Sequence, residues 1–238
     1  MSGESSAAQP NVPGNDRAAG PRVVVIHTSV ATVEVFGRLL RERLPEARVS
    51  NMVDDSILPE LRENGGDVNA VRARWGDYAR IAREQGADLI LNACSSIGEL
   101  CEPLQRELGV PVVRVDARMA REAVARGRRV AVVATLPSTL RPTRDLLLAT
   151  ARDAGREVDV TATLVEGAFA TLMAGDAAGH DDRVAAALRE ACQSADVVVL
   201  AQGSMARVLP RLSAAEQARC LISPPLAVET VAEVLRGA

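Results

Sequence analysis

The sequence predicts an α/β fold with two pseudo-symmetric lobes, each built on a parallel sheet. From Arg22 onward, short β-branched runs alternate with helical patterns, a rhythm typical of parallel sheets that are covered on both faces. The two halves also match each other. RVVVIHTS (22–29) aligns with RVAVVATL (129–136), and ADLILNACSS (87–96) aligns with ADVVVLAQGS (195–204) at nearly the same separation. We therefore interpret the chain as an internal duplication.

The elements of the first half follow in order from these patterns. The β-branched runs predict strands at 22–27, 47–53, 88–93 and 111–115. Apolar residues recur at three- and four-residue steps between these runs, which predicts helices at 31–44, 68–81 and 97–108.

The second half repeats the arrangement. Strands are predicted at 129–134, 157–164 and 196–201, with helices that begin at Ser138 and near Asp182. Residues 1–20 are rich in Gly, Pro, Ser and Ala without apolar periodicity, so we expect a disordered tail. We assign residues 21–116 and 224–238 to the first lobe, and residues 117–223 to the second.

Composition limits the classes of function. The net charge is only −3 and aromatic residues make up 2% of the chain, which disfavours nucleic-acid binding by charge or base stacking. The apolar runs are too short to cross a bilayer, so no membrane partner is expected. Four cysteines without CxxC spacing and two histidines favour reduced thiols in the cytoplasm and no metal site. Apolar helix faces would allow a homo-oligomer.

Polar side chains follow the predicted strand ends, where ligands gather in open parallel sheets. If the two sheets face each other, these residues line an interlobe cleft, in which we place the active site. Each hydroxyl could simply cap a helix, but together with exposed N–H groups they favour a small carboxylate ligand. The hydroxyl residues are Thr28, Ser29, Ser95, Ser96, Thr135, Ser138, Thr139 and Ser204.

Cys94 is the candidate reacting group because it stands between a strand and a helix start. Helix-start N–H groups favour the thiolate, so we expect a thiol pKa below its reference of about 8.5. The alternative is a small buried apolar residue. His27, at the end of the first strand, is either catalytic or a satisfied core histidine. His180 is expected to be solvated in a polar loop.

The other three cysteines are not candidates for the reacting group. Cys101 and Cys192 lie within predicted helices, and Cys220 begins a short apolar run. We expect all three to belong to the hydrophobic core.

The chain resembles the aspartate/glutamate/hydantoin racemase superfamily from residue 22 to about 236. The motifs are VVVIHTSVATVEVF, NMVDDSILPEL, LILNACSSIGEL, VAVVATLPSTLRPT, VVVLAQGSM and LISPPLAVETVAEVL. The resemblance implies a cofactor-free active site in which one cysteine from each lobe flanks the substrate α-carbon.

By the same resemblance, Asn92 and Cys94 match the cysteine motif of the first lobe. Thr135, Ser138 and Thr139 match a loop that holds the substrate carboxylate. The cysteine of the second lobe is replaced by Gln202, which is followed by Gly203 and Ser204. We expect these residues to contact the substrate.

Gln202 changes the expected chemistry, because an amide has no accessible ionisation with which to carry a proton. His27 could act as the second proton carrier, Cys94 alone could protonate an enediolate after loss of carbon dioxide, or Cys94 could attack an unsaturated diacid. We favour an isomerase that acts on a small carboxylic or hydroxy acid through Cys94. The alternatives are a one-thiol lyase and a carboxylate-binding protein without catalysis.

Overall fold

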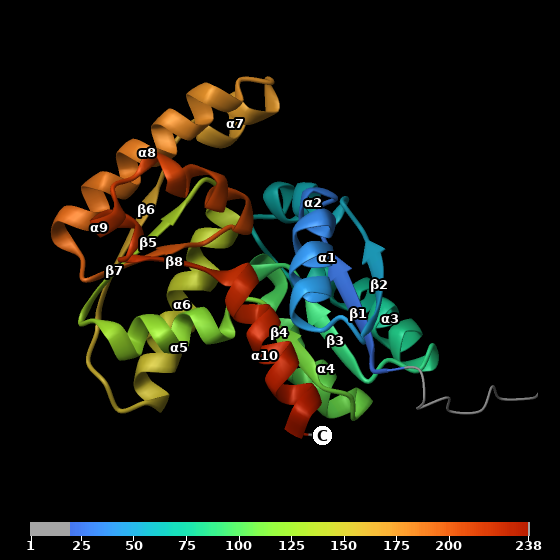
Figure 1. Cartoon of the computed structure of the whole chain (residues 1–238). Coiled ribbons are helices and arrows are strands. Elements are labelled where there is room, and N and C mark those ends of the chain that lie inside the picture. Colours follow the sequence, from blue (N-terminus) through green and yellow to red (C-terminus); the bar gives the residue numbers. More distant parts are fainter. Residues whose placement is uncertain (1–19, 238) are drawn as a thin grey trace, which may run out of the picture.

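The computed structural model describes residues 20–237 (Figure 1). The tail predicted at 1–20 therefore lies, except for Gly20, outside the described residues. Within residues 20–237 no helix is long and apolar enough to span a membrane.

Two four-stranded sheets form the centres of the two lobes (Figure 1). All pairs within each sheet are parallel. The first sheet has the order β2 (Arg48–Val53), β1 (Arg22–His27), β3 (Leu89–Asn92) and β4 (Val112–Arg114). The second has the equivalent order β6 (Asp159–Leu164), β5 (Arg129–Ala134), β7 (Val197–Leu200) and β8 (Cys220–Ile222). The predicted fold class is confirmed.

The duplication is visible in individual hydrogen bonds. The Asp88 carboxylate accepts the backbone N–H of Arg22 at 2.7 Å, and the Asp196 carboxylate accepts that of Arg129 at 2.9 Å. Each bond joins the start of the third strand of a lobe to the start of its first strand. The same sequence pattern, Ala-Asp before a buried strand, therefore fixes the same register in both lobes.

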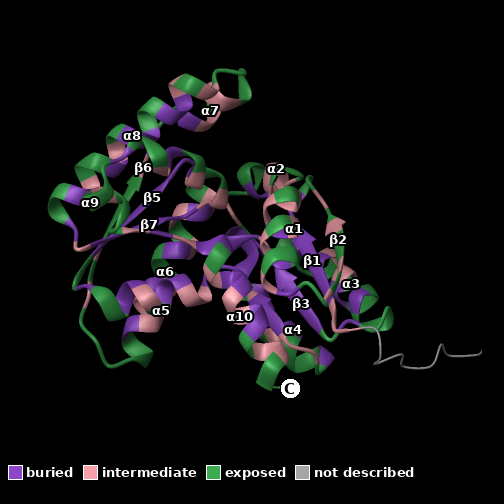
Figure 2. Ribbon diagram, in the orientation of Figure 1, coloured by how far each residue is buried: buried purple, intermediate pink, exposed green. Residues whose placement is uncertain are grey.

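In the first lobe, alternate residues of β1 face two helical layers. Val24 and Ile26 pack against the layer of α2 (Ile57–Glu63), α3 (Asn69–Glu84) and α4 (Cys101–Leu108), which is centred on Trp75. Val23 and Val25 pack against α1 (Ala31–Arg43) and α10 (Ser223–Gly237). This two-residue alternation is the signature of a strand buried on both faces. Figure 2 shows the inner strands buried and the edge strand β2 more exposed.

The second lobe has the same two layers. Helices α5 (Ala117–Arg126) and α6 (Pro137–Asp153) cover one face of its sheet. The other face is covered by α8 (Ala177–Ser194), by the short α7 (Ala168–Met173) and by the 3-10 helix η3 (Gly203–Arg211), which precedes α9 (Ala214–Gln217).

The chain crosses between the lobes twice. Helix α5 follows β4 of the first sheet but packs on the second, and α10 follows β8 of the second sheet but packs on the first. Figure 1 shows α5 beneath the second sheet, with α10 next to it on the side of the first sheet. These crossings tie the strand ends of the two lobes together.

Two predicted helices and the environment of one histidine differ in the structure. Helix α8 begins at Ala177 rather than near Asp182, because Asp176 caps it by accepting the Gly179 N–H at 2.8 Å. His180 is consequently not solvated but buried in α8, and its Nδ1 lies 2.9 Å from the Asp181 carboxylate. The helix predicted at 97–108 is a 3-10 helix, η2 (Ser95–Leu100), followed by α4.

Candidate active site between the lobes

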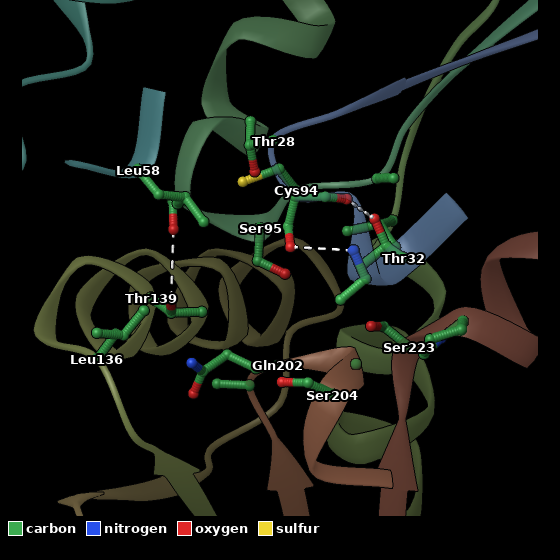
Figure 3. Close-up of a pocket in the computed structure, with 18 of the residues that line it drawn as sticks. Thr28, Thr32, Leu58, Cys94, Ser95, Leu136, Thr139, Gln202, Ser204 and Ser223 are labelled. Carbon is green, nitrogen blue, oxygen red and sulfur yellow. Dashed lines mark hydrogen bonds between the residues drawn. The ribbon is translucent and has the colours of Figure 1, made fainter. Parts of the chain in front are cut away.

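A cavity of about 140 Å³ lies where the carboxyl ends of both sheets meet (Figure 3). Its wall takes side chains from the loops after β1, β3 and β7, and from α1, α2, α6, α7 and α10. The structure brings together nine of the predicted cleft residues here: Thr28, Ser29, Cys94, Ser95, Ser96, Thr139, Gln202, Gly203 and Ser204.

Cys94 and Gln202 occupy equivalent positions on the two lobes. Each follows the third strand of its sheet and precedes a 3-10 helix. Their backbone angles are nearly the same, φ −132° and ψ 116° for Cys94 and φ −129° and ψ 132° for Gln202. The two residues therefore enter one cavity from opposite sides, as Figure 3 shows.

The surroundings of the Cys94 sulfur act in opposite directions on its ionisation. Burial raises the pKa of the thiol, since only 7% of the residue is exposed. Hydrogen bonds from the Thr28 hydroxyl, the Ser96 and Ile97 N–H groups and the Ser96 hydroxyl lower it. The net pKa lies above the ordinary value. Our expectation of a lowered pKa is thus wrong, because desolvation outweighs the donors at the start of η2.

Asn92 holds the backbone of Cys94 from behind. Its Nδ2 donates to the Cys94 carbonyl at 3.0 Å and to the Cys101 sulfur at 3.2 Å, while its Oδ1 accepts the Cys94 N–H at 3.3 Å. Asn92 is fully buried and does not line the cavity. It positions Cys94, and the expected direct contact with substrate is not supported by this geometry.

Gln202 is held against Thr135, the residue that follows β5. Its Oε1 accepts the Thr135 N–H at 2.7 Å, and its Nε2 donates to the Thr135 hydroxyl at 2.9 Å. Thr135 itself does not line the cavity. The equivalent pair in the first lobe is Cys94 with Thr28, whose hydroxyl lies beside the sulfur in Figure 3.

His27 lies behind the cavity and does not line it. Its Nδ1 is 2.7 Å from the Thr32 hydroxyl, its Nε2 is 3.0 Å from Asn51 Oδ1, and its ring meets Phe36 edge-on. Burial lowers its pKa, so the ring is held neutral. With both nitrogens engaged in the fold, His27 has no geometry for the proton-carrier role that we considered from the sequence.

Two residues of the predicted carboxylate loop, Ser138 and Thr139, lie on α6 and face different cavities. Thr139 faces the cavity, where its hydroxyl lies 3.3 Å from that of Ser96 in the other lobe. Ser138 faces a neighbouring groove together with Arg62 and Arg141, so it lies outside the reaction cavity. Its Oγ is shielded from solvent and has no hydrogen-bond partner among the described residues.

Several residues of the wall were not anticipated from the sequence. Thr32 and Ser223 add hydroxyls, and Leu58, Leu136 and Phe169 form an apolar side. Ser223 stands in the quoted LISPP motif at the start of α10, which was the available signal for it. Phe169 comes from α7, a helix for which the sequence pattern gave no prediction.

The cavity combines hydroxyl groups with a largely apolar wall and has no charged side chain among the described residues that line it. Among the described residues that line it there is no Asp, Glu, Arg or His, so Cys94 is its only titratable side chain of ordinary range. A carboxylate in this site would be held by hydroxyls and by the N–H groups at the start of η2. Such a site can bind a small acid beside a single thiol.

Comparison with known proteins supports this interpretation. A family model described as Asp/Glu/Hydantoin racemase matches residues 22–231. No curated protein matches the sequence.

Solved structures with the same fold include several enzymes. A glutamate racemase isoform from Bacillus anthracis has a TM-score of 0.73 and 15% identity over 92% of this chain and 83% of its own. Allantoin racemase from Klebsiella pneumoniae has a TM-score of 0.60 and 20% identity over 91% of this chain and 88% of its own. A glycine-to-cysteine mutant of arylmalonate decarboxylase has a TM-score of 0.55 and 21% identity over 92% of this chain and 94% of its own. At these identities the likeness shows the fold alone.

Proposed function

The chain belongs to the Asp/Glu/hydantoin racemase family, and from that premise we propose that it is an isomerase of a small carboxylic or hydroxy acid with Cys94 as its reacting group. One observation carries the proposal. Cys94 is the only titratable side chain in the described cavity wall, and it lies among donors that suit a carboxylate.

The proton must be handled on one face of the substrate. Gln202, on the opposite face, has no accessible ionisation, and its amide is already bonded to Thr135. Inversion by two thiols is therefore outside the chemistry of this site. When a carbon–carbon double bond adjoins the carbon next to the carboxylate, a single thiolate can remove a proton from that carbon and return it, on the same face, to the far carbon of the conjugated enediolate, which moves the double bond. Such a transfer rearranges the substrate without changing its composition.

The carboxylate and the enediolate need stabilisation that the cavity wall supplies. Ser95, Thr139 and Ser204 add hydroxyl donors to the cavity wall, and α6 begins beside the cavity. Donors aimed at developing negative charge in a site shielded from water stabilise it more than water does. Lysine does not occur in the 238 residues, so a Schiff base on this chain has no amine to form it.

A second candidate is a one-thiol lyase, favoured by the raised pKa of Cys94. A neutral thiol suits the donation of a proton to an enediolate that is left after carbon dioxide departs. The apolar side of the wall, Leu58, Leu136 and Phe169, would disfavour a carboxylate placed against it and so promote that departure.

The test is incubation of the protein with a panel of small carboxylic and hydroxy acids in deuterium oxide. NMR reports deuterium incorporation and isomer formation, and carbon dioxide release reports a lyase. Cys94→Ala should abolish either signal, whereas Cys192→Ala, in the distant core of the second lobe, should retain it. Turnover that survives Cys94→Ala would refute the role of this thiol. Thermal stabilisation by an acid without turnover would instead indicate a binding protein.

A further inference from the structure

Phe169 is one of two aromatic residues in the cavity wall, the other being the fully buried Phe36, and the wall also includes the apolar Leu58 and Leu136. It lies on the six-residue helix α7 of the second lobe, directly after the fully buried Ala168. Phe169 itself is half-buried. Its side chain is therefore in contact with the cavity and is also partly accessible to solvent.

A side chain of the opposite lobe holds this ring. The guanidinium carbon of Arg62, on α2, lies 5.4 Å from the centroid of the Phe169 ring. Attraction between a cation and an aromatic face operates at this distance. No carboxylate pairs with Arg62 among the described residues, so the ring is its specific partner there. The contact joins α2 of the first lobe to α7 of the second (Figure 1).

Glycines in the left-handed region flank α7. Gly167 precedes the helix with φ +73°, and Gly175 follows it with φ +88°. Glycine adopts this region without strain, so these two positions let the chain turn sharply into and out of the short helix. A short helix between two such residues depends on its side-chain contacts for its position.

We propose that Phe169 is the gate and specificity-determining residue of the cavity, and that Arg62 is the positioning residue that holds it closed. Small acids reach Cys94 past the closed ring, whereas larger molecules require the ring to move away from Arg62. The inference goes beyond the proposed function because it concerns access to the thiol and holds whichever reaction Cys94 performs.

The experiment measures alkylation of Cys94 by a small reagent, iodoacetamide, and by a bulky one, a biotin-conjugated maleimide. Peptide mass spectrometry gives the rate at each cysteine. Arg62→Ala should raise the rate with the bulky reagent about two- to fivefold, the factor that an exposed cation–π contact is worth. Phe169→Ala should raise it further and bring the rates of the two reagents closer together. Arg141→Ala, which removes another exposed arginine from the adjoining groove, should change neither rate.

Cys101 separates gating from unfolding. It is buried near Cys94 but does not line the cavity, so local unfolding would expose both thiols while an open gate exposes Cys94 alone. Unchanged Cys94 rates in Arg62→Ala and Phe169→Ala would overturn the proposal, as would an equal rise at Cys101. Alkylation needs no turnover, so failure of the gate is distinguishable from failure of the proposed function.

Discussion

Gln202 and Thr135 form in the second lobe the pair that Cys94 and Thr28 form in the first. The Thr135 N–H donates to Gln202 Oε1 at 2.7 Å, and the Thr28 hydroxyl faces the Cys94 sulfur. Both threonines follow the first strand of their sheet, and both partners follow the third. The two lobes thus share the geometry of this pair, while only the first lobe carries an ionisable side chain at the end of its third strand.

Replacing Gln202 with cysteine should create or raise deuterium exchange with inversion. The equivalent backbone conformations at 94 and 202 place the new thiol across the cavity from Cys94. Proton removal on one face and return on the other then become possible. Gln202→Ser is the matched control, since it shortens the side chain without adding an acid. Chiral chromatography of an acid turned over in deuterium oxide measures the effect. No gain over Gln202→Ser would show that the cavity is shaped for different chemistry.

Much of the fold follows from periodicity and from the repeat. Residues 23–26 and 130–134 are unbroken apolar runs of Val, Ile and Ala, which is typical of a sheet buried on both faces. Helix α5 escaped prediction because its buried face consists of Met119, Ala120, Ala123 and Val124, where small alanines weaken the apolar signal. The early start of α8 depends on the cap by Asp176, a local contact within a polar segment.

The site was less predictable than the fold. Residues at strand ends, such as Cys94 and Gln202, were placed by the repeat, because equivalent sheets put equivalent ends in one cleft. The repeat did not predict which side chains near a strand end point into the cavity. His27 and Asn92 point into the fold, and Ser138 faces away from Thr139, because the rotation of each backbone segment decides which neighbour reaches the cavity. The pKa of Cys94 depends on burial, which spacing does not reveal.

Gly98→Ala should destabilise the protein by about 1–3 kcal/mol. A Cβ at this position of η2 would overlap the Arg114 guanidinium, which is bound to the fully buried Asp116 at 2.6 Å. The clash displaces either η2, with its donors to Cys94, or the ion pair. Gly76→Ala, in the middle of α3 with ordinary contacts, is the control and should be neutral or stabilising by up to about 1 kcal/mol. Urea unfolding measures both, and equal stabilities would contradict the clash.

His27→Gln should make stability less dependent on pH between about 7.5 and 5.5. Burial lowers the pKa of His27 below 6.5 in the folded state. As pH falls below 6.5 the unfolded chain binds a proton that the folded chain does not. The free energy of unfolding of the unmodified protein therefore falls, at most by about 1.4 kcal/mol per pH unit from this group. Urea unfolding at several pH values gives the difference between the two proteins. A difference that stays constant with pH would contradict the lowered pKa.

Thr28→Val should raise the pKa of the Cys94 thiol further above its ordinary value. The Thr28 hydroxyl donates to the sulfur and favours the thiolate, and valine keeps the shape of the side chain without the donor. Since the thiolate is the reactive form, the pH profile of iodoacetamide alkylation at Cys94 should move to higher pH, and the rate at pH 8 should fall. Ser29→Ala is the control, because Ser29 lines the cavity but is not among the donors to this sulfur. A profile that moves equally in both variants would show that the change reflects the cavity as a whole and that Thr28 has no specific effect on the thiol.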